Sequence, residues 1–328
     1  MKHSRAALAG LWILAIAVLA FAPLFGMEFI PLNATGQERE ILLNIRLPRV
    51  LCAFAAGAML SLSGMSFQAL FRNPLATPFT LGVSSGAALG AALFIRFGMA
   101  FALLGISGTS IAAFVGALLS ILLVYGLTQL KGGFSTPTLL LSGLAISFFF
   151  SSLILFIQYI SGLTQSFRIV HWMMGSLSTA DYSKFGNLLP FLALGGLLLA
   201  FLHREMNLFM VGEDMAISRG VNTRRVKKLI FLAASLMVGG VVAVCGPIGF
   251  VGMMSPHICR LLVGADHRFL TPASFLFGGL FLTLCDTLTR VLSGYSSGAE
   301  LPVGILTALL GGPFFLLLLL NRKGGLDL

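Results

Sequence analysis

The stretch that decides the fold is residues 67–87, FQALFRNPLATPFTLGVSSGA. It places an Arg-Asn-Pro turn, at residues 72–74, inside a hydrophobic run that otherwise reads as membrane-spanning. Because proline lacks an amide hydrogen and disfavours helix in the residue before it, the turn ends one helix and separates it from the next. A polar turn between two apolar spans indicates a gate rather than an anchor.

The composition of the 328 residues is that of a membrane protein. Hydrophobic residues make up 57% of the chain and charged residues only 10%, which leaves too little polar surface to coat a soluble domain of this size. The apolar segments also lack the alternation of membrane-spanning strands. Because backbone polar groups in lipid need internal partners, we expect residues 1–328 to form a single all-α integral membrane domain.

Hydrophobic runs, read against glycine, proline and charge, predict about ten transmembrane helices. The expected ranges are 6–26, 47–71, 80–96, 108–129, 137–160, 186–202, 229–246, 253–264, 269–292 and 302–320. The eighth is short and follows Gly246-Pro247-Ile248-Gly249, which predicts a broken or re-entrant segment. The first has a basic start like that of a signal peptide, but it is long enough to span, and we expect it to be retained.

Small residues recur at helical spacing in two of these ranges. A stripe of this kind gives a flat helix face on which a neighbouring helix approaches closely, so we interpret both stripes as packing devices. They consist of Gly82, Gly86 and Gly90, and of Ala53, Gly57 and Ser61.

The formal net charge of +10 reflects membrane topology rather than nucleic-acid binding, because the basic residues sit at the ends of apolar spans. More of them fall on the side that holds both termini than on the opposite side, so we expect both termini to be cytoplasmic. The opposite side still keeps several, among them Arg39, Arg168 and Lys184. Some of these residues are expected to do more than orient the protein.

The longest charged segment is residues 203–228, expected to lie in the cytoplasm. Glu213 and Asp214 stand at the start of a short helical stretch, Gly220 and Asn222 end it, and four cations follow within residues 224–228. This order predicts a compact helix outside the bilayer. We favour a protein docking element over a loop that touches anionic lipid, since a lipid-binding loop needs neither the carboxylates nor the stop signal.

The chain carries no strong signal for a metal, a cofactor or catalysis. Its four cysteines lie in apolar segments without a CxxC pair, and His171 and His257 have no second ligand at metal-binding spacing. A P-loop is excluded because the chain contains no Gly-Lys dipeptide, and an HExxH motif and a nucleophile elbow are also missing. We therefore expect no cofactor and no enzymatic activity, with energy supplied by a partner.

Ordered motifs along nearly the whole chain resemble one family, the FecCD-type permease subunits of bacterial ABC importers. The matching stretches are IRLPRVL at 45–51, GAMLSLSGMSFQ at 57–68, RNPLATP at 72–78, LGVSSGA at 81–87, STPTLLLSGLA at 135–145, HWMMGSLS at 171–178, GEDMAISRGV at 212–221, GPIGFVGMMSPHICR at 246–260, ADHR at 265–268 and ELPVGILTALLGGPFF at 300–315.

The resemblance implies a fold and a set of partners. The fold is the type II ABC importer permease, with ten helices, as a multi-pass protein of the bacterial inner membrane. The partners are a second copy of the chain, two cytoplasmic ABC ATPases and a periplasmic or lipid-anchored binding protein, together with membrane lipid and no nucleic acid.

The resemblance also implies three groups of site residues. The gate comprises Asn73, Leu75, Ser135 and Thr136, although ordinary tight turns are an alternative. The ATPase coupling segment comprises Gly212, Glu213, Asp214, Ala216, Arg219 and Gly220. Arg46, Arg49 and Arg290 are expected to dock acidic residues of the binding protein through exposed guanidinium groups. An ion pair between Arg290 and Asp286 is an alternative that does not exclude docking.

We expect the cargo to be a ferric siderophore, with cobalamin and haem as the alternatives. No residue in the sequence selects among them. An ion-coupled secondary transporter is the alternative from another class, and it would need an ionisable residue deep in a span. Only Asp286 and Arg290 come near that requirement.

Overall fold

The computed structural model describes residues 2–74, 76–99, 101–103, 106–130, 136–294 and 300–320. All ten predicted helices are present among these residues. They are α1 (Lys2–Phe21), α3 (Leu47–Phe71), α4 (Val83–Arg96), α5 (Gly108–Leu130), α6 (Thr136–Tyr159), α8 (Tyr182–Phe201), α11 (Thr223–Cys245), α12 (Val251–Val263), α13 (His267–Ser293) and α14 (Val303–Leu320). Within the described residues, seven helices are long and apolar enough to cross a membrane, and α4, α12 and α14 are shorter apolar helices. The predicted all-helical membrane fold is confirmed.

Short elements join these helices. They are the 3-10 helices η1 (Ala22–Leu24) and η3 (Pro78–Leu81), the π-helix η2 (Leu42–Arg46), the helices α2 (Gln37–Ile41), α7 (Leu163–Met173), α9 (His203–Val211) and α10 (Glu213–Ser218), and the strands β1 (Ala102–Leu103) and β2 (Ile106–Ser107). The strands form an antiparallel pair with Ala102 opposite Ser107. The sequence predicted neither this hairpin nor α7.

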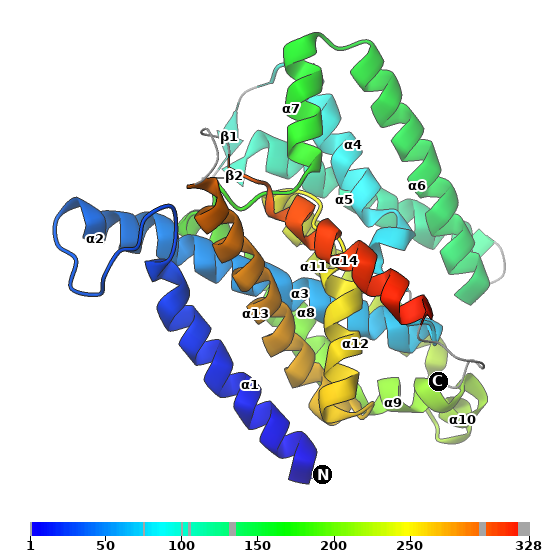
Figure 1. Cartoon of the computed structure of the whole chain (residues 1–328). Coiled ribbons are helices and arrows are strands. Elements are labelled where there is room, and N and C mark those ends of the chain that lie inside the picture. Colours follow the sequence, from blue (N-terminus) through cyan, green and yellow to red (C-terminus); the bar gives the residue numbers. More distant parts are fainter. Residues whose placement is uncertain are drawn as a thin grey trace.

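The helices form a bundle with two distinct ends (Figure 1). At one end lie α9, α10 and the first residues of α1; we call it the α10 end. At the other lie α7, the hairpin and the C-terminal end of α4; we call it the α7 end. The charged segment 203–228 therefore gathers at a single end of the bundle, as the sequence predicts.

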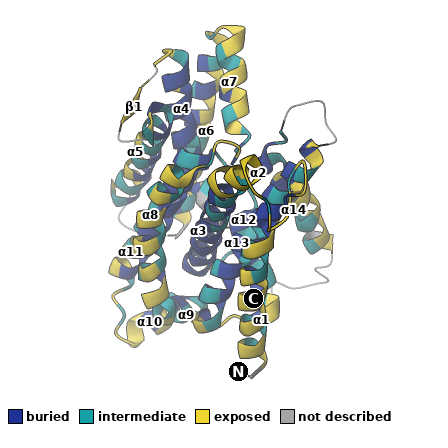
Figure 2. Cartoon of the chain, turned by 90° about the vertical axis from the view of Figure 1, so that its left-hand side faces the viewer, coloured by how far each residue is buried: buried dark blue, intermediate teal, exposed yellow. Residues whose placement is uncertain are grey.

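Helix α3 forms the centre of the bundle, and nearly all of its side chains are buried (Figure 2). At Gly57 a Cβ atom would overlap the backbone of Gly278 on α13, and at Gly64 it would overlap the backbone of Gly252 on α12. These crossings confirm that the Ala53-Gly57-Ser61 stripe packs against a neighbour. The approach is possible because small residues let helix backbones meet.

The second stripe packs in part as predicted. Gly86 and Gly90 face the backbone of α5 at Gly116 and Ala112. Gly82 has a different task, since it precedes α4 with a φ of +78°, a left-handed conformation that glycine adopts without strain. The helix predicted from residue 80 therefore begins at Val83.

The predicted break between the seventh and eighth helices is present. Residues 246–250 are not helical, and Phe250 begins α12 with a φ of +67°. The segment runs beside residues 174–178, where the Ser176 amide donates to the Cys245 carbonyl at 2.8 Å. Irregular backbone at membrane depth is tolerated only where protein or a water-filled cavity surrounds it, and here residues 174–178 cover part of the segment.

Candidate functional site

The coupling helix predicted from the sequence is α10. Glu213 and Asp214 occupy its first turn, and Ala216 is fully buried. Gly220 ends it with a φ of +79°, and its amide donates to the Ile217 carbonyl at 2.9 Å. The negative carboxylates interact favourably with the partial positive charge at the start of the helix. The glycine adopts the left-handed conformation that ends the helix.

An ion pair fixes α10 to the bundle. The Lys227 ammonium on α11 lies 2.6 Å from Glu213 Oε2, and Lys227 is 5% exposed. Among the four cations of residues 224–228, Lys227 is thus a buried structural partner rather than part of an exposed basic face. Glu213 therefore positions α10, and its side chain is still 42% exposed.

A second contact fixes α9. The Asn207 side-chain amide donates to Asp266 Oδ1 at 2.8 Å, and its oxygen accepts the His267 backbone amide at 2.9 Å. Asp266 also accepts the Arg268 amide as the cap of α13, and these hydrogen bonds lower the pKa of the Asp266 carboxyl. Nothing in the sequence spacing of Asn207 and Asp266 predicted this link between α9 and α13.

The remaining face of α10 is open to solvent. Met215 and Ile217 are 42% and 56% exposed, and Asp214 and Arg219 beside them are exposed as well. Two apolar side chains framed by charges of both signs have the character of a protein docking surface: an apolar centre with a polar rim.

The three predicted docking arginines are not the exposed forks that the sequence analysis expected. Arg46 is half-buried, and its guanidinium donates to the carbonyls of Leu24 at 3.0 Å and Glu28 at 2.8 Å. Arg49 and Arg290 are buried, with exposed fractions of 6% and 4%. The expected exposure of these two is wrong, because carboxylates and carbonyls of this same chain surround them.

Asp286 is the centre of that cluster. Its fully buried carboxylate receives Arg49 Nε and Nη2 at 3.0 to 3.1 Å and lies 3.3 Å from Arg290 Nε. The Arg49 Nη1 atom binds Glu300 at 2.9 Å. The ion pair between Arg290 and Asp286 that the sequence allowed is present. Asp286 is thus held in ion pairs with residues of this same chain, which favours a structural role for it over ion coupling.

The predicted gate residues follow helix breaks. Arg72 takes a left-handed conformation after α3, and the Asn73 amide donates to the Gln68 carbonyl at 3.2 Å. Thr136 is the first residue of α6. Leu75 and Ser135 lie outside the described residues. The turn after α3 is confirmed, and the role of these residues as a gate stays a prediction.

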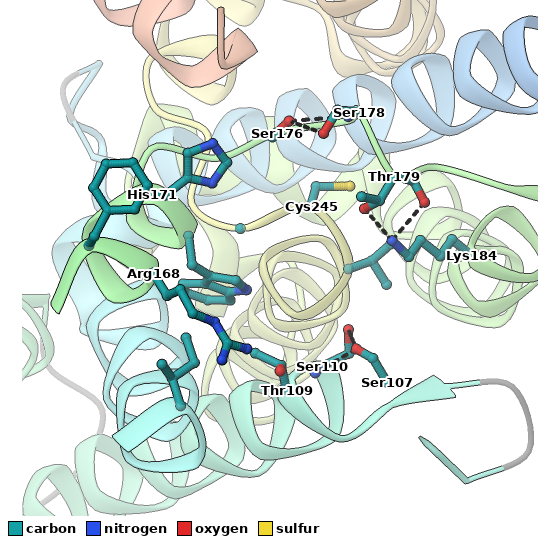
Figure 3. A pocket seen from close by; sticks show the side chains of 15 residues that line it. Ser107, Thr109, Ser110, Arg168, His171, Ser176, Ser178, Thr179, Lys184 and Cys245 are labelled. Atoms are coloured by element: carbon teal, nitrogen blue, oxygen red, sulfur yellow. Dashed lines mark hydrogen bonds between the residues drawn. The ribbon is translucent and has the colours of Figure 1, made fainter. Parts of the chain in front are cut away.

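The α7 end contains a cavity of about 500 Å³ (Figure 3). Its walls come from α4, α5, α7, α8 and the end of α11, and its lining includes the predicted outward cations Arg168 and Lys184. His171 also lines it, beside the ring of Phe167. Among the described residues, no group of three or more His, Cys, Asp or Glu side chains could hold a metal ion.

Comparison with known proteins settles the family. The sequence profile of the FecCD transport family matches residues 6–321. The chain belongs to the FecCD transport family. As a FecCD protein it is the permease subunit of an ABC importer for metal chelates, a multi-pass protein of the cytoplasmic membrane that works with ATPase and binding-protein partners and is not itself catalytic.

Individual FecCD relatives agree with this assignment. The chain is 42% identical over 289 residues to the hemin transport system permease protein HmuU of Yersinia pestis, which covers 87% of this chain and 84% of that protein. It is 40% identical over 280 residues to the cobalamin import system permease protein BtuC of Halobacterium salinarum, covering 85% and 73%. A solved structure of a metal-chelate type ABC transporter in an inward-facing conformation matches with a TM-score of 0.85 at 34% identity, covering 96% of this chain and 98% of that one.

The sequence analysis of this FecCD chain did not identify Lys227 and Glu300 as partners of the predicted site residues Glu213 and Arg49, or Asn207 as the partner of Asp266. Each pairs with a residue distant in sequence, for example Arg49 with Glu300. The charge of Glu300 just before the last helix was the only available signal, since an acidic residue beside an apolar span calls for a cationic partner.

Proposed function

We propose that this chain, as a homodimer, forms the translocation pathway for a metal chelate and is opened from the α10 end by two ABC ATPase subunits. The observation that carries the proposal is the state of α10. Glu213 and the buried Ala216 fix it to the bundle, while Met215, Ile217 and Arg219 remain exposed. A helix that is anchored on one face and open on the other can transmit force from a bound partner.

The charges near α10 indicate the orientation of the chain in the membrane. The exposed cations Arg224, Arg225 and Lys228 lie beside α10, and basic residues favour the cytoplasmic side. We place the α10 end, with both termini, in the cytoplasm. The α7 end then faces outward, where a binding protein delivers the cargo, and residues 1–328 act as one membrane domain with a coupling segment at about 203–228.

The binding protein would dock at the outer end through Arg46, Arg49 and Arg290. Its acidic residues would replace partners that these arginines have within the chain. Glu300 is the accessible carboxylate of the cluster, since its side chain is 33% exposed whereas that of Asp286 is fully buried. An acidic residue of the binding protein would therefore compete with Glu300 for Arg49 and leave the Asp286 pair in place. The gate at Asn73, Leu75, Ser135 and Thr136 would respond at the inner end.

The proposed cargo is a ferric siderophore, with cobalamin and haem as alternatives. Related permeases are named for different cargoes, hemin and cobalamin among them, so the family supports the class of metal chelates. We assign selection among chelates mainly to the binding protein, because weak contacts along a pathway allow release of a bulky ligand.

Proteoliposomes that contain the permease, its ATPase and its binding protein test this function. Uptake of labelled ferric siderophore should require ATP, and labelled cobalamin and haem serve as the alternatives. The double variant Glu213→Ala and Arg219→Ala should keep ATP hydrolysis but lose uptake, while Arg224→Ala, an exposed cation outside α10, should retain both. Uptake without any ATPase subunit would refute the proposal.

A further inference from the structure

The cavity at the α7 end is lined by cations and hydroxyl groups. Among the fifteen residues drawn in Figure 3, Arg168 and Lys184 carry positive charge, and no lining residue is an aspartate or a glutamate. Six lining residues carry hydroxyl groups: Ser107, Thr109, Ser110, Ser176, Ser178 and Thr179. The lining therefore carries two positive charges and many hydrogen-bond donors.

Arg168 is the residue that points to a ligand. It lies on α7, and its guanidinium reaches into the cavity toward Thr109 at the start of α5 (Figure 3). It makes no hydrogen bond or ion pair with the residues that the structure describes. Arg168 is exposed, so its donors are solvated and available to a ligand. A guanidinium carries five donors in a planar fork that matches the two oxygens of a carboxylate or phosphate.

Lys184 supplies the opposite wall. Its ammonium group donates to the carbonyl of Thr179 at 2.7 Å and also to the Thr179 hydroxyl. These contacts fix the position of the charge without neutralising it, because neither acceptor is an anion. The third ammonium hydrogen remains available for a ligand.

The hydroxyl groups can adapt to an anion. Ser107 bonds to Ser110 at 2.9 Å and Ser176 to Ser178 at 3.0 Å, so each pair can turn one hydrogen toward a bound oxygen. The remaining wall is apolar, with Ile95, Val244 and Trp172. Small-molecule sites combine an apolar lining with a few placed polar groups in about this volume.

We propose that the α7-end cavity binds an oxyanion group, a carboxylate or a phosphate, through Arg168 and Lys184. Two sources have this chemistry: a small soluble carboxylate or phosphate compound that arrives at this face, and the phosphate of a lipid headgroup at the bilayer surface. The site goes beyond the proposed function, since binding here requires neither transport nor a partner subunit.

Trp172 in the cavity wall provides the measurement. The chain has two tryptophans, and Trp12 is 50% exposed on α1. In the full-length Trp12→Phe variant, purified in uncharged detergent, the fluorescence of Trp172 should change saturably on titration with citrate or inorganic phosphate. Arg168→Gln should weaken that affinity by about tenfold or more, as expected for loss of a charge-assisted bond, and Arg168→Lys should weaken it less.

Arg39→Gln is the matched control, because it removes one exposed cation from α2 and leaves the cavity intact. Its affinity for citrate should equal that of the parent variant. Nanodiscs of phosphatidylcholine, a zwitterionic lipid that carries a phosphate, separate the two sources: if they lower the apparent citrate affinity relative to uncharged detergent, lipid phosphate competes for the site, and if they do not, the soluble anion is the ligand. The proposal would be overturned if neither citrate nor phosphate gave a saturable signal. It would also be overturned if Arg168→Gln and Arg39→Gln bound citrate with equal affinity.

Discussion

Arg49 on α3 binds Asp286 on α13 through both Nε and Nη2, at distances of 3.0 to 3.1 Å. The two side chains are 6% and 0% exposed, so the pair lies outside water. A buried pair of this geometry is sensitive to loss of either partner, because the charge that remains has no compensation. It therefore locks α3 to α13.

Asp286→Asn should lower the free energy of unfolding by about 3–5 kcal/mol, since it leaves Arg290 buried without an anion and Arg49 with Glu300 alone. Thermal denaturation of the purified protein in detergent measures the loss. Glu300→Gln is the control, because its half-exposed carboxylate should contribute less than about 1 kcal/mol. Equal losses in the two variants would show that burial does not set the strength of these pairs.

Ile217→Asp should abolish coupling while the fold survives. The side chain is 56% exposed on α10, so a charge there disturbs an interface rather than the core. ATP-driven uptake should fall at least about tenfold, as for a buried interface anchor, with an unchanged melting temperature. Ala216→Asp, at a fully buried position of the same helix, should instead prevent folding. An unaltered uptake rate in Ile217→Asp would exclude this face as the contact.

Gly64→Ala should destabilise the crossing of α3 and α12. A Cβ atom at Gly64 would overlap the backbone of Gly252, and a backbone cannot move aside as a side chain can. Overpacking of this kind costs about 1–3 kcal/mol or more. Gly126→Ala is the control on α5, where nothing lies within 4 Å of the added atom, and alanine there should raise helix stability by up to about 1 kcal/mol. Melting temperatures that move in the same direction would contradict the packing argument.

Asp266 should make the link between α9 and α13 sensitive to acid. Its pKa is lower in the folded protein than in the unfolded chain, because the charged form accepts the Arg268 amide and the Asn207 side chain. The stabilisation is therefore complete above the unfolded pKa of about 4 and is lost as pH falls through the lower folded value. As the pH is lowered, the melting temperature of the wild type should fall. The melting temperature of Asp266→Asn, which keeps a capping oxygen but does not titrate, should change less. Parallel curves would refute the assignment.

The fold was largely predictable because each helix is marked locally. Helix breaks occur at Pro74 and at the Gly246-Pro247 pair, where the sequence predicts them. The glycine stripes likewise affect the packing of the helices that contain them. Helix α10 was predictable for the same reason, since its carboxylates and its terminal glycine are signals from a single segment. The helix α7 was missed because its eleven residues fall between two spans, and because its start is capped by the Gln165 side chain, which accepts the Gly162 amide, rather than by a Ser, Thr, Asp or Asn before the helix.

The state of the site residues was not predictable because it depends on pairing across the bundle. Arg49 and Asp286 are 237 positions apart, and no local pattern reveals that they meet. The sequence analysis treated Arg49 as exposed because the family resemblance implies that it docks acidic residues of the binding protein. A charged side chain can be buried when a partner of opposite charge is buried beside it. For Arg49 that partner is Asp286 on α13.

Helix α13 begins beside the Asp266 contact at the α10 end and carries Asp286 and Arg290 near its other terminus. Its 27 residues form one continuous helix, about 40 Å long at 1.5 Å per residue. A displacement of α9 would thus reach the arginine cluster along a single rod, with no loop between them to absorb it. One continuous helix thus joins the α10 end to the arginine cluster, and under the proposed orientation a movement at the inner surface would reach the outer one through it.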